Sequence, residues 1–102
     1  MIEVCERIRY LSEEQLKDPS ENSYTILAHT VEELGEFSTA ICIEDNSGVK
    51  GYKELGESAS EEAIDVMICA LSLYYSRGGK TEDIVPYLNK KLDKWESKIP
   101  GS

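Results

Sequence analysis

The sequence predicts an all-α fold, a four-helix bundle-like domain that is completed by oligomerisation. Apolar residues recur at helical spacing in four segments, and proline, glycine or small polar residues separate these segments. No segment has a convincing strand pattern. Amphipathic helices joined by short links favour a bundle. At 102 residues, the chain is expected to be a single domain, residues 1–102, with one core and little surplus stability.

The first helix is expected over residues 2–17. Its apolar residues recur at roughly helical spacing, with charged residues between them: Ile2, Cys5, Ile8, Leu11 and Leu16. Pro19 disfavours helical geometry at Asp18, so the helix should end there.

The second helix is expected over residues 23–44, with Asn22 or Ser23 as its cap. Its apolar residues share one side, and its acidic residues lie on nearly the opposite side, towards water if the helix is considered alone. Gly35 interrupts the helix at a cost of about 1 kcal/mol relative to alanine, which suggests close approach of a neighbour or a ligand. A loop over residues 45–53 should follow, and it contains Lys50 and Lys53.

The third helix should begin after Ser58, because Glu61 three residues later completes a capping box. Gly78 and Gly79 favour its termination. Residues 63–75 are apolar almost all round, which predicts a central helix that is buried on several sides. One stripe of this helix is different and holds acidic, small and hydroxyl side chains: Glu62, Asp65, Cys69, Ser72 and Ser76.

The fourth helix is expected to start near Thr81 or Asp83. Asp83 is the better cap, since Pro86 would then fall in the first turn, where proline is tolerated. The helix should continue to Trp95, with lysines on its other faces.

Two acidic motifs dominate the second and third helices. Glu33 and Glu36 lie three residues apart on one, and Glu62 and Asp65 lie three residues apart on the other, so each pair shares a helix face. Residues 37–61 separate the pairs, a length that can fold the helices antiparallel. Facing carboxylates repel unless a cation lies among them, and Mg²⁺ or Mn²⁺ takes such oxygen ligands. Asp65 is an aspartate in apolar surroundings, and it also needs a partner, either a metal or a lysine.

Composition excludes several classes of function. The net charge of −9 and the pI near 4.5 argue against nucleic-acid binding through a basic surface. One histidine and three scattered cysteines do not form a zinc ligand set. The odd number of cysteines favours reduced thiols, and the absence of a secretory leader or a membrane-spanning run favours a cytoplasmic protein without membrane contact.

The two acidic motifs resemble the signature of the MazG-like, all-α nucleoside triphosphate pyrophosphohydrolases, relatives of the dimeric dUTPases and the dCTPases. The resemblance covers most of the chain. It implies that Glu33, Glu36, Glu62 and Asp65 bind Mg²⁺ and that Glu32 activates water. It further implies hydrolysis of an NTP or dNTP to the monophosphate and pyrophosphate in nucleotide-pool housekeeping, and a homodimer or homotetramer.

Other residues are candidates for substrate contact. His29 lies one turn before Glu33 and could touch the nucleotide, orient a carboxylate or be an ordinary surface histidine. Lys91 and Lys94 could hold the departing pyrophosphate or belong to a solvated basic face, and Lys50 and Lys53 are weaker candidates. The aromatic residues could stack on the base, although helical spacing favours packing: Tyr74, Tyr75, Tyr87 and Trp95.

Three alternatives compete with the enzyme. A non-enzymatic acidic helical module could dimerise or bind a partner through the third helix, and a nucleotide sensor could keep the metal site without turnover. A carboxylate-bridged di-iron bundle ranks low, because it needs Glu-x-x-His pairs and no histidine follows an acid at that spacing.

Overall fold

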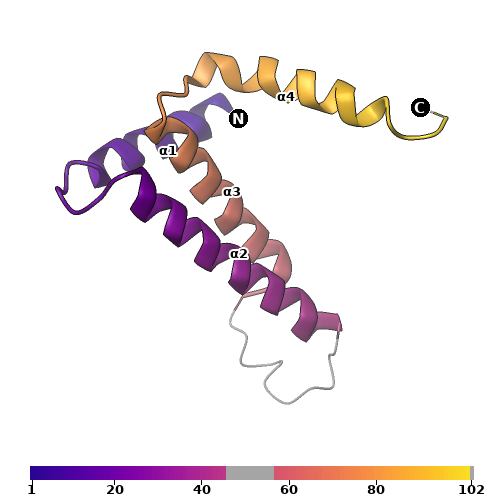
Figure 1. The fold of residues 1–102 in the computed structure, drawn as a ribbon, viewed down its shortest axis with the longest axis horizontal. Coiled ribbons are helices and arrows are strands. Elements are labelled where there is room, and N and C mark those ends of the chain that lie inside the picture. The colour runs from indigo at the N-terminus through magenta and orange to yellow at the C-terminus, as the bar shows by residue number, and fades with distance from the viewer. Residues whose placement is uncertain (46–56, 102) are drawn as a thin grey trace.

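The computed structural model describes residues 1–45 and 57–101, and these residues form four helices and no strand (Figure 1). The helices are α1 (Ile2–Gln15), α2 (Ser23–Asp45), α3 (Ala59–Ser76) and α4 (Thr81–Glu96). The predicted all-α, helical-bundle class is therefore confirmed. In the part of the chain that is described, no helix is both long enough and apolar enough to cross a membrane.

An antiparallel hairpin of α2 and α3 is the centre of the fold (Figure 1). This pair makes the most extensive contact between helices, and α1 packs against α3 at the opposite end of the hairpin from the α2–α3 connection. Helix α4 contacts α1 to a smaller extent and projects away from the hairpin.

The start of α2 agrees with the sequence prediction. The Asn22 side-chain oxygen accepts hydrogen bonds from the backbone N–H groups of Tyr24 at 2.8 Å and Thr25 at 3.1 Å. These bonds satisfy two donors that the first turn of a helix leaves without a partner. Helix α1 ends two residues earlier than predicted and α2 ends one residue later.

Both predicted ends of α3 are confirmed. Ser58 accepts a hydrogen bond from the N–H of Glu61 at 3.2 Å, and the capping box is complete. Gly78 follows the helix with a φ of 87°, a conformation that favours glycine. Gly79 is needed for a different reason, since a Cβ there would lie 2.4 Å from the ring of Tyr74.

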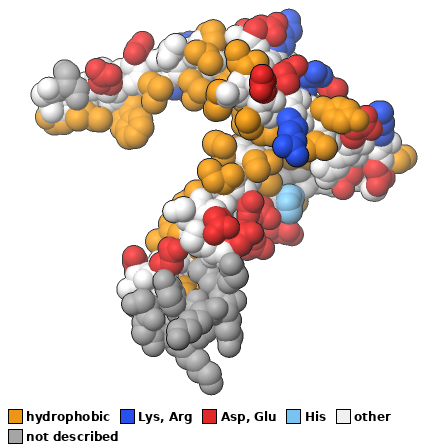
Figure 2. Space-filling view, turned by 180° about the vertical axis from the view of Figure 1, so that it is seen from behind, with side chains coloured by type: hydrophobic (Ala, Val, Ile, Leu, Met, Phe, Trp, Pro, Cys, Tyr) orange, Lys and Arg blue, Asp and Glu red, His pale blue; other side chains and the backbone are white. Residues whose placement is uncertain are grey.

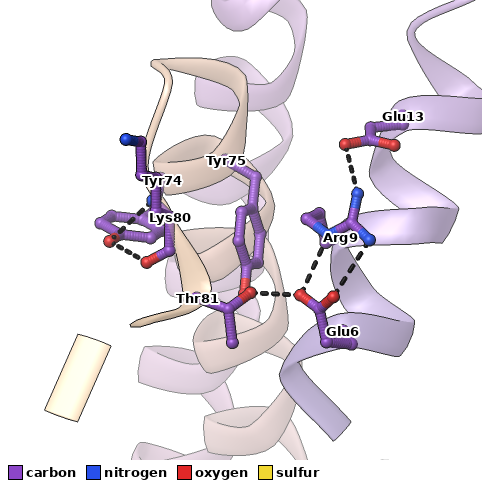
Figure 3. Close-up of polar contacts among 7 residues, drawn as sticks. All are labelled: Glu6, Arg9, Glu13, Tyr74, Tyr75, Lys80 and Thr81. Carbon is purple, nitrogen blue, oxygen red and sulfur yellow. Dashed lines mark hydrogen bonds and ion pairs between the residues drawn. The ribbon is translucent and has the colours of Figure 1, made fainter. Parts of the chain in front are cut away.

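Of the two predicted starts of α4, Thr81 is confirmed, and the preference for Asp83 as the cap is wrong. The helix begins at Thr81 and Lys80 is its N-cap, so Pro86 falls in the second turn and removes a backbone hydrogen bond to the carbonyl of residue 82. Tertiary contacts fix the start instead. The Tyr75 hydroxyl bonds to that of Thr81 at 2.8 Å, and Thr81 donates to Glu6 of α1 (Figure 3).

The prediction that α3 is buried on several sides is wrong for a single chain. Ile64, Met67 and Ile68 are 50%, 41% and 42% exposed, and Glu62 is the one buried residue of the helix. The polar stripe of α3 is its packing face. Hydroxyl pairs join this stripe to the other two helices, Ser72 to Ser12 of α1 at 2.8 Å and Ser76 to Ser23 of α2 at 3.0 Å.

Candidate metal centre

Three carboxylates converge between α2 and α3. Glu33 comes from α2, and Glu62 and Asp65 come from successive turns of α3. One oxygen atom from each residue lies within 4.8 Å of the other two. We refer to Glu33, Glu62 and Asp65 as the acidic cluster. The predicted spacing brings the cluster together because residues three apart share a helix face and the antiparallel hairpin turns the two faces towards each other.

Two of these carboxylates have a buried oxygen atom without a partner. Glu62 is 8% exposed, and the Glu33 side chain is 15% exposed. The Oε2 atoms of both are buried and accept no hydrogen bond from any described residue. Because buried polar groups are almost always hydrogen-bonded, an orphaned carboxylate oxygen indicates a missing cationic or hydrogen-bonding partner.

The electrostatics of the cluster favour the same conclusion. Burial raises the pKa of Glu33, and the nearby charges of Glu36 and Asp65 raise it further. Burial also raises the pKa of Glu62, again with contributions from Glu36 and Asp65. The charges of Glu36 and Asp65 therefore both act on Glu33 and Glu62, although Glu36 is exposed and its oxygen atoms lie outside the group of three.

Sequence reasoning missed a fifth acid, Glu57. The charge of Asp65 raises the pKa of Glu57, and a hydrogen bond between the two side chains adds to the effect. Glu57 precedes the N-cap Ser58, so no helical spacing relates it to the cluster. The turn that enters α3 brings it there.

The cluster contains oxygen donors alone. Carboxylate oxygens without imidazole or thiolate ligands suit hard cations such as Mg²⁺ and Mn²⁺ better than Zn²⁺. Cys69 follows Asp65 by one turn, but burial raises the pKa of its thiol, and the charges of Glu33 and Asp65 raise it further. A thiol that is kept neutral is a poor metal ligand.

No family model, curated protein or solved structure matches the chain. The assignment of the site therefore depends on its own geometry.

His29 links the cluster to the predicted water-activating residue. Its Nε2 atom lies 3.5 Å from Glu33 Oε1, and its Nδ1 atom lies 3.7 Å from Glu32 Oε2. Figure 2 shows the histidine beside a group of acidic side chains. The Glu32 side chain is 73% exposed and lies outside the cluster, so it faces solvent at the edge of the site.

The structure does not bring the candidate lysines to the cluster. Lys91 and Lys94 are exposed on α4, which projects away from the hairpin (Figure 1). Lys50 and Lys53 lie outside the described residues. A role for these lysines in pyrophosphate binding stays a prediction.

The candidate aromatic residues also lie away from the cluster. The Tyr74 and Tyr75 rings pack edge to face, 5.3 Å apart, at the end of α3 that is distant from Glu62. Their hydroxyl groups bond to the start of α4 (Figure 3). Tyr87 and Trp95 are exposed on α4. Packing therefore accounts for Tyr74 and Tyr75.

Proposed function

We propose that the chain is a Mg²⁺-dependent nucleoside triphosphate pyrophosphohydrolase of the MazG-like all-α family, which converts an NTP or dNTP and water to the monophosphate and pyrophosphate. Mn²⁺ is an alternative cation. One observation carries the proposal. The buried Oε2 atoms of Glu33 and Glu62 have no hydrogen-bond partner among the described residues, and both side chains converge with Asp65.

Glu33, Glu62 and Asp65 would hold the cation, with Glu36 and Glu57 alongside them. When bound, the cation supplies positive charge that offsets the charge of the triphosphate and of the leaving pyrophosphate. The net charge of the chain is a second argument for a cation. A chain with a net charge of −9 repels a triphosphate unless cations accompany it.

Glu32 is the proposed general base. Its exposed carboxylate can accept a proton from a water molecule whose oxygen attacks the α-phosphorus. The bond from the α-phosphorus to the bridging oxygen then breaks, and pyrophosphate leaves with that oxygen. His29 lies between Glu32 and Glu33, and its ring N–H can donate to one of these carboxylates.

A product analysis tests the proposal. The protein is incubated with a panel of NTPs and dNTPs plus Mg²⁺ or Mn²⁺, and the products are identified. The proposal predicts monophosphate and pyrophosphate. Diphosphate and phosphate would contradict it, and so would the absence of any reaction. Tight nucleotide binding without turnover would instead indicate a nucleotide sensor.

A further inference from the structure

A cavity of about 390 Å³, partly open to solvent, lies between α1, α2 and α3, and the three residues of the acidic cluster are outside its lining. Four of its eleven lining residues are aliphatic: Ile8, Leu11, Ile26 and Ile68. His29 and Cys69 also line it. These two residues are one helical turn from Glu33 and Asp65 respectively, so the cavity opens towards the proposed cation site.

The cavity extends along α2 away from the cluster. Thr25 and Glu21 line its far end, and Gln15 of α1 lies in the same lining. Thr25 precedes Glu33 by eight residues, which corresponds to about 12 Å along the helix axis. A nucleotide with its phosphates at the cluster can span this distance and place its base between the aliphatic walls.

Most polar groups of the lining already have hydrogen-bond partners. The hydroxyl groups of Ser12 and Ser72 bond to each other at 2.8 Å. The Thr25 hydroxyl accepts from the N–H of Asn22 at 2.9 Å. It has two acceptors within reach of its one proton, Glu21 Oε2 at 2.7 Å and the Asn22 carbonyl oxygen at 2.8 Å. Glu21 Oε2 therefore lies against Thr25.

Two lining groups remain available to a ligand. Within residues 1–45 and 57–101, no side-chain hydrogen bond involves Glu21 Oε1 or the amide of Gln15. An ionised carboxylate can only accept hydrogen bonds, whereas an amide both donates and accepts. The far end of the cavity is therefore suited to a ligand edge that has at least one N–H donor.

We propose that this cavity binds the base of the substrate and that Glu21 favours bases with an exocyclic amino group. Cytosine, adenine and guanine offer an amino N–H to the carboxylate. Uracil and thymine have no exocyclic amino group. Their one N–H donor on this edge, at N3, lies between two carbonyl oxygens, and a carboxylate that approaches it is repelled by these oxygens. The inference rests on the proposed function and goes beyond it, since the acidic cluster alone does not distinguish one base from another.

The test compares a cytosine nucleotide with a uracil nucleotide in the wild type and in Glu21→Gln. Calorimetry gives the Kd values of CMP and UMP in the presence of Mg²⁺, and turnover assays give kcat/KM for CTP and UTP. Glutamine keeps the acceptor for Thr25 but adds an N–H that can donate to a carbonyl oxygen. We expect the wild type to prefer cytosine about ten-fold in both assays and the variant to lose this preference.

Glu14→Gln is the matched control. Glu14 is exposed on α1, pairs with Lys17 at 3.0 Å and does not line the cavity. The Glu14→Gln substitution removes one negative charge, as Glu21→Gln does. Any general gain in affinity for an anionic nucleotide should therefore occur in both variants. The ratio of the two bases should change in Glu21→Gln alone.

The possible results separate the two proposals. Equal Kd values for CMP and UMP in the wild type, or a ratio that Glu21→Gln leaves unchanged, would overturn the base-binding inference even if triphosphates are hydrolysed. A cytosine preference in binding that Glu21→Gln abolishes, in a protein that hydrolyses no triphosphate, would support the inference and refute the pyrophosphohydrolase.

Discussion

At the α1–α4 contact opposite charges are paired, whereas the acidic cluster brings like charges together. Arg9 contacts Glu6 at 2.9 Å and Glu13 at 2.8 Å, and Glu6 also accepts a hydrogen bond from Thr81 (Figure 3). The acidic cluster brings three carboxylates within 4.8 Å of one another, and two of their buried oxygens have no partner in the described part of the chain.

The pKa values of the two regions change in opposite directions. Hydrogen bonds from Arg9 and Thr81 lower the pKa of Glu6, so its charged form stabilises the fold. Burial and neighbouring acids raise the pKa values of Glu33 and Glu62, so their charged forms oppose folding. The comparison teaches that the first region balances its charges within one chain, whereas the second gathers like charges, which is the basis for proposing a cation there.

The largest expected effect is on turnover. Glu62→Gln and Asp65→Asn each remove a proposed ligand charge while keeping the side-chain shape, so kcat/KM for a hydrolysed triphosphate should fall about 100-fold or more. Glu14→Gln is the control, because it removes an exposed charge on α1 that pairs with Lys17 and is not part of the cluster. Turnover near the wild-type value in Asp65→Asn would remove this residue from the cation site.

The next effect concerns stability without a cation. Glu62→Gln should raise the melting temperature of the metal-free protein by several degrees, since it removes a buried charge that has no partner. Added Mg²⁺ should raise the melting temperature of the wild type and leave the variant almost unchanged, because a ligand stabilises the state that binds it. Thermal unfolding with MgCl₂ and with a chelator measures both quantities.

A lower melting temperature for metal-free Glu62→Gln would contradict this account. It would mean that the carboxylate already has a stabilising partner in the apo protein.

At the α1–α4 contact, removal of an acidic side chain should change the melting temperature in the opposite direction. Glu6→Gln should lower the melting temperature at pH 7, because the folded-state pKa of Glu6 lies below the ordinary value of a glutamate carboxyl group. A lowered pKa adds stability above the unfolded-state pKa, and this stability is lost as the pH falls through the folded-state value. The difference between wild type and variant should therefore shrink from pH 7 to about pH 3.5. A difference that is equal at both pH values would show that ionisation of Glu6 is not the cause.

Gly35→Ala should have the smallest effect. No described atom lies within 4 Å of a Cβ at this position, so the close approach of a neighbour that the sequence suggested is absent from the described residues. Alanine should raise the free energy of unfolding by about 1 kcal/mol, as measured by urea denaturation. A decrease would show that the space is needed in the folded state. Loss of turnover in a stabilised variant would show that the substrate uses it.

Local patterns in the sequence predicted much of the fold. Helical spacing and caps at Asn22 and Ser58 gave the helices and the starts of α2 and α3, because these signals act within one or two turns. The carboxylate pairs were predictable for the same reason. The choice between Thr81 and Asp83 as the start of α4 was not, since Thr81 contacts Tyr75 and Glu6, and these contacts are not visible in the local sequence.

Other parts of the site depend on tertiary structure. Glu57 reaches Asp65 through a turn that has no spacing rule. The cavity is formed by side chains from three helices, and no single segment of the sequence contains a signal for it. The exposed apolar face of α3 was misjudged because composition alone does not show which faces one chain covers.

Hydrolysis of a triphosphate in ¹⁸O-labelled water tests the central claim most directly. Mass spectrometry of the products identifies the phosphorus atom that the water attacks. Attack on the α-phosphorus, as proposed with Glu32 as the base and the acidic cluster as the cation site, predicts that the monophosphate contains the label and that pyrophosphate does not. Label in pyrophosphate, or diphosphate and phosphate as products, would contradict the account.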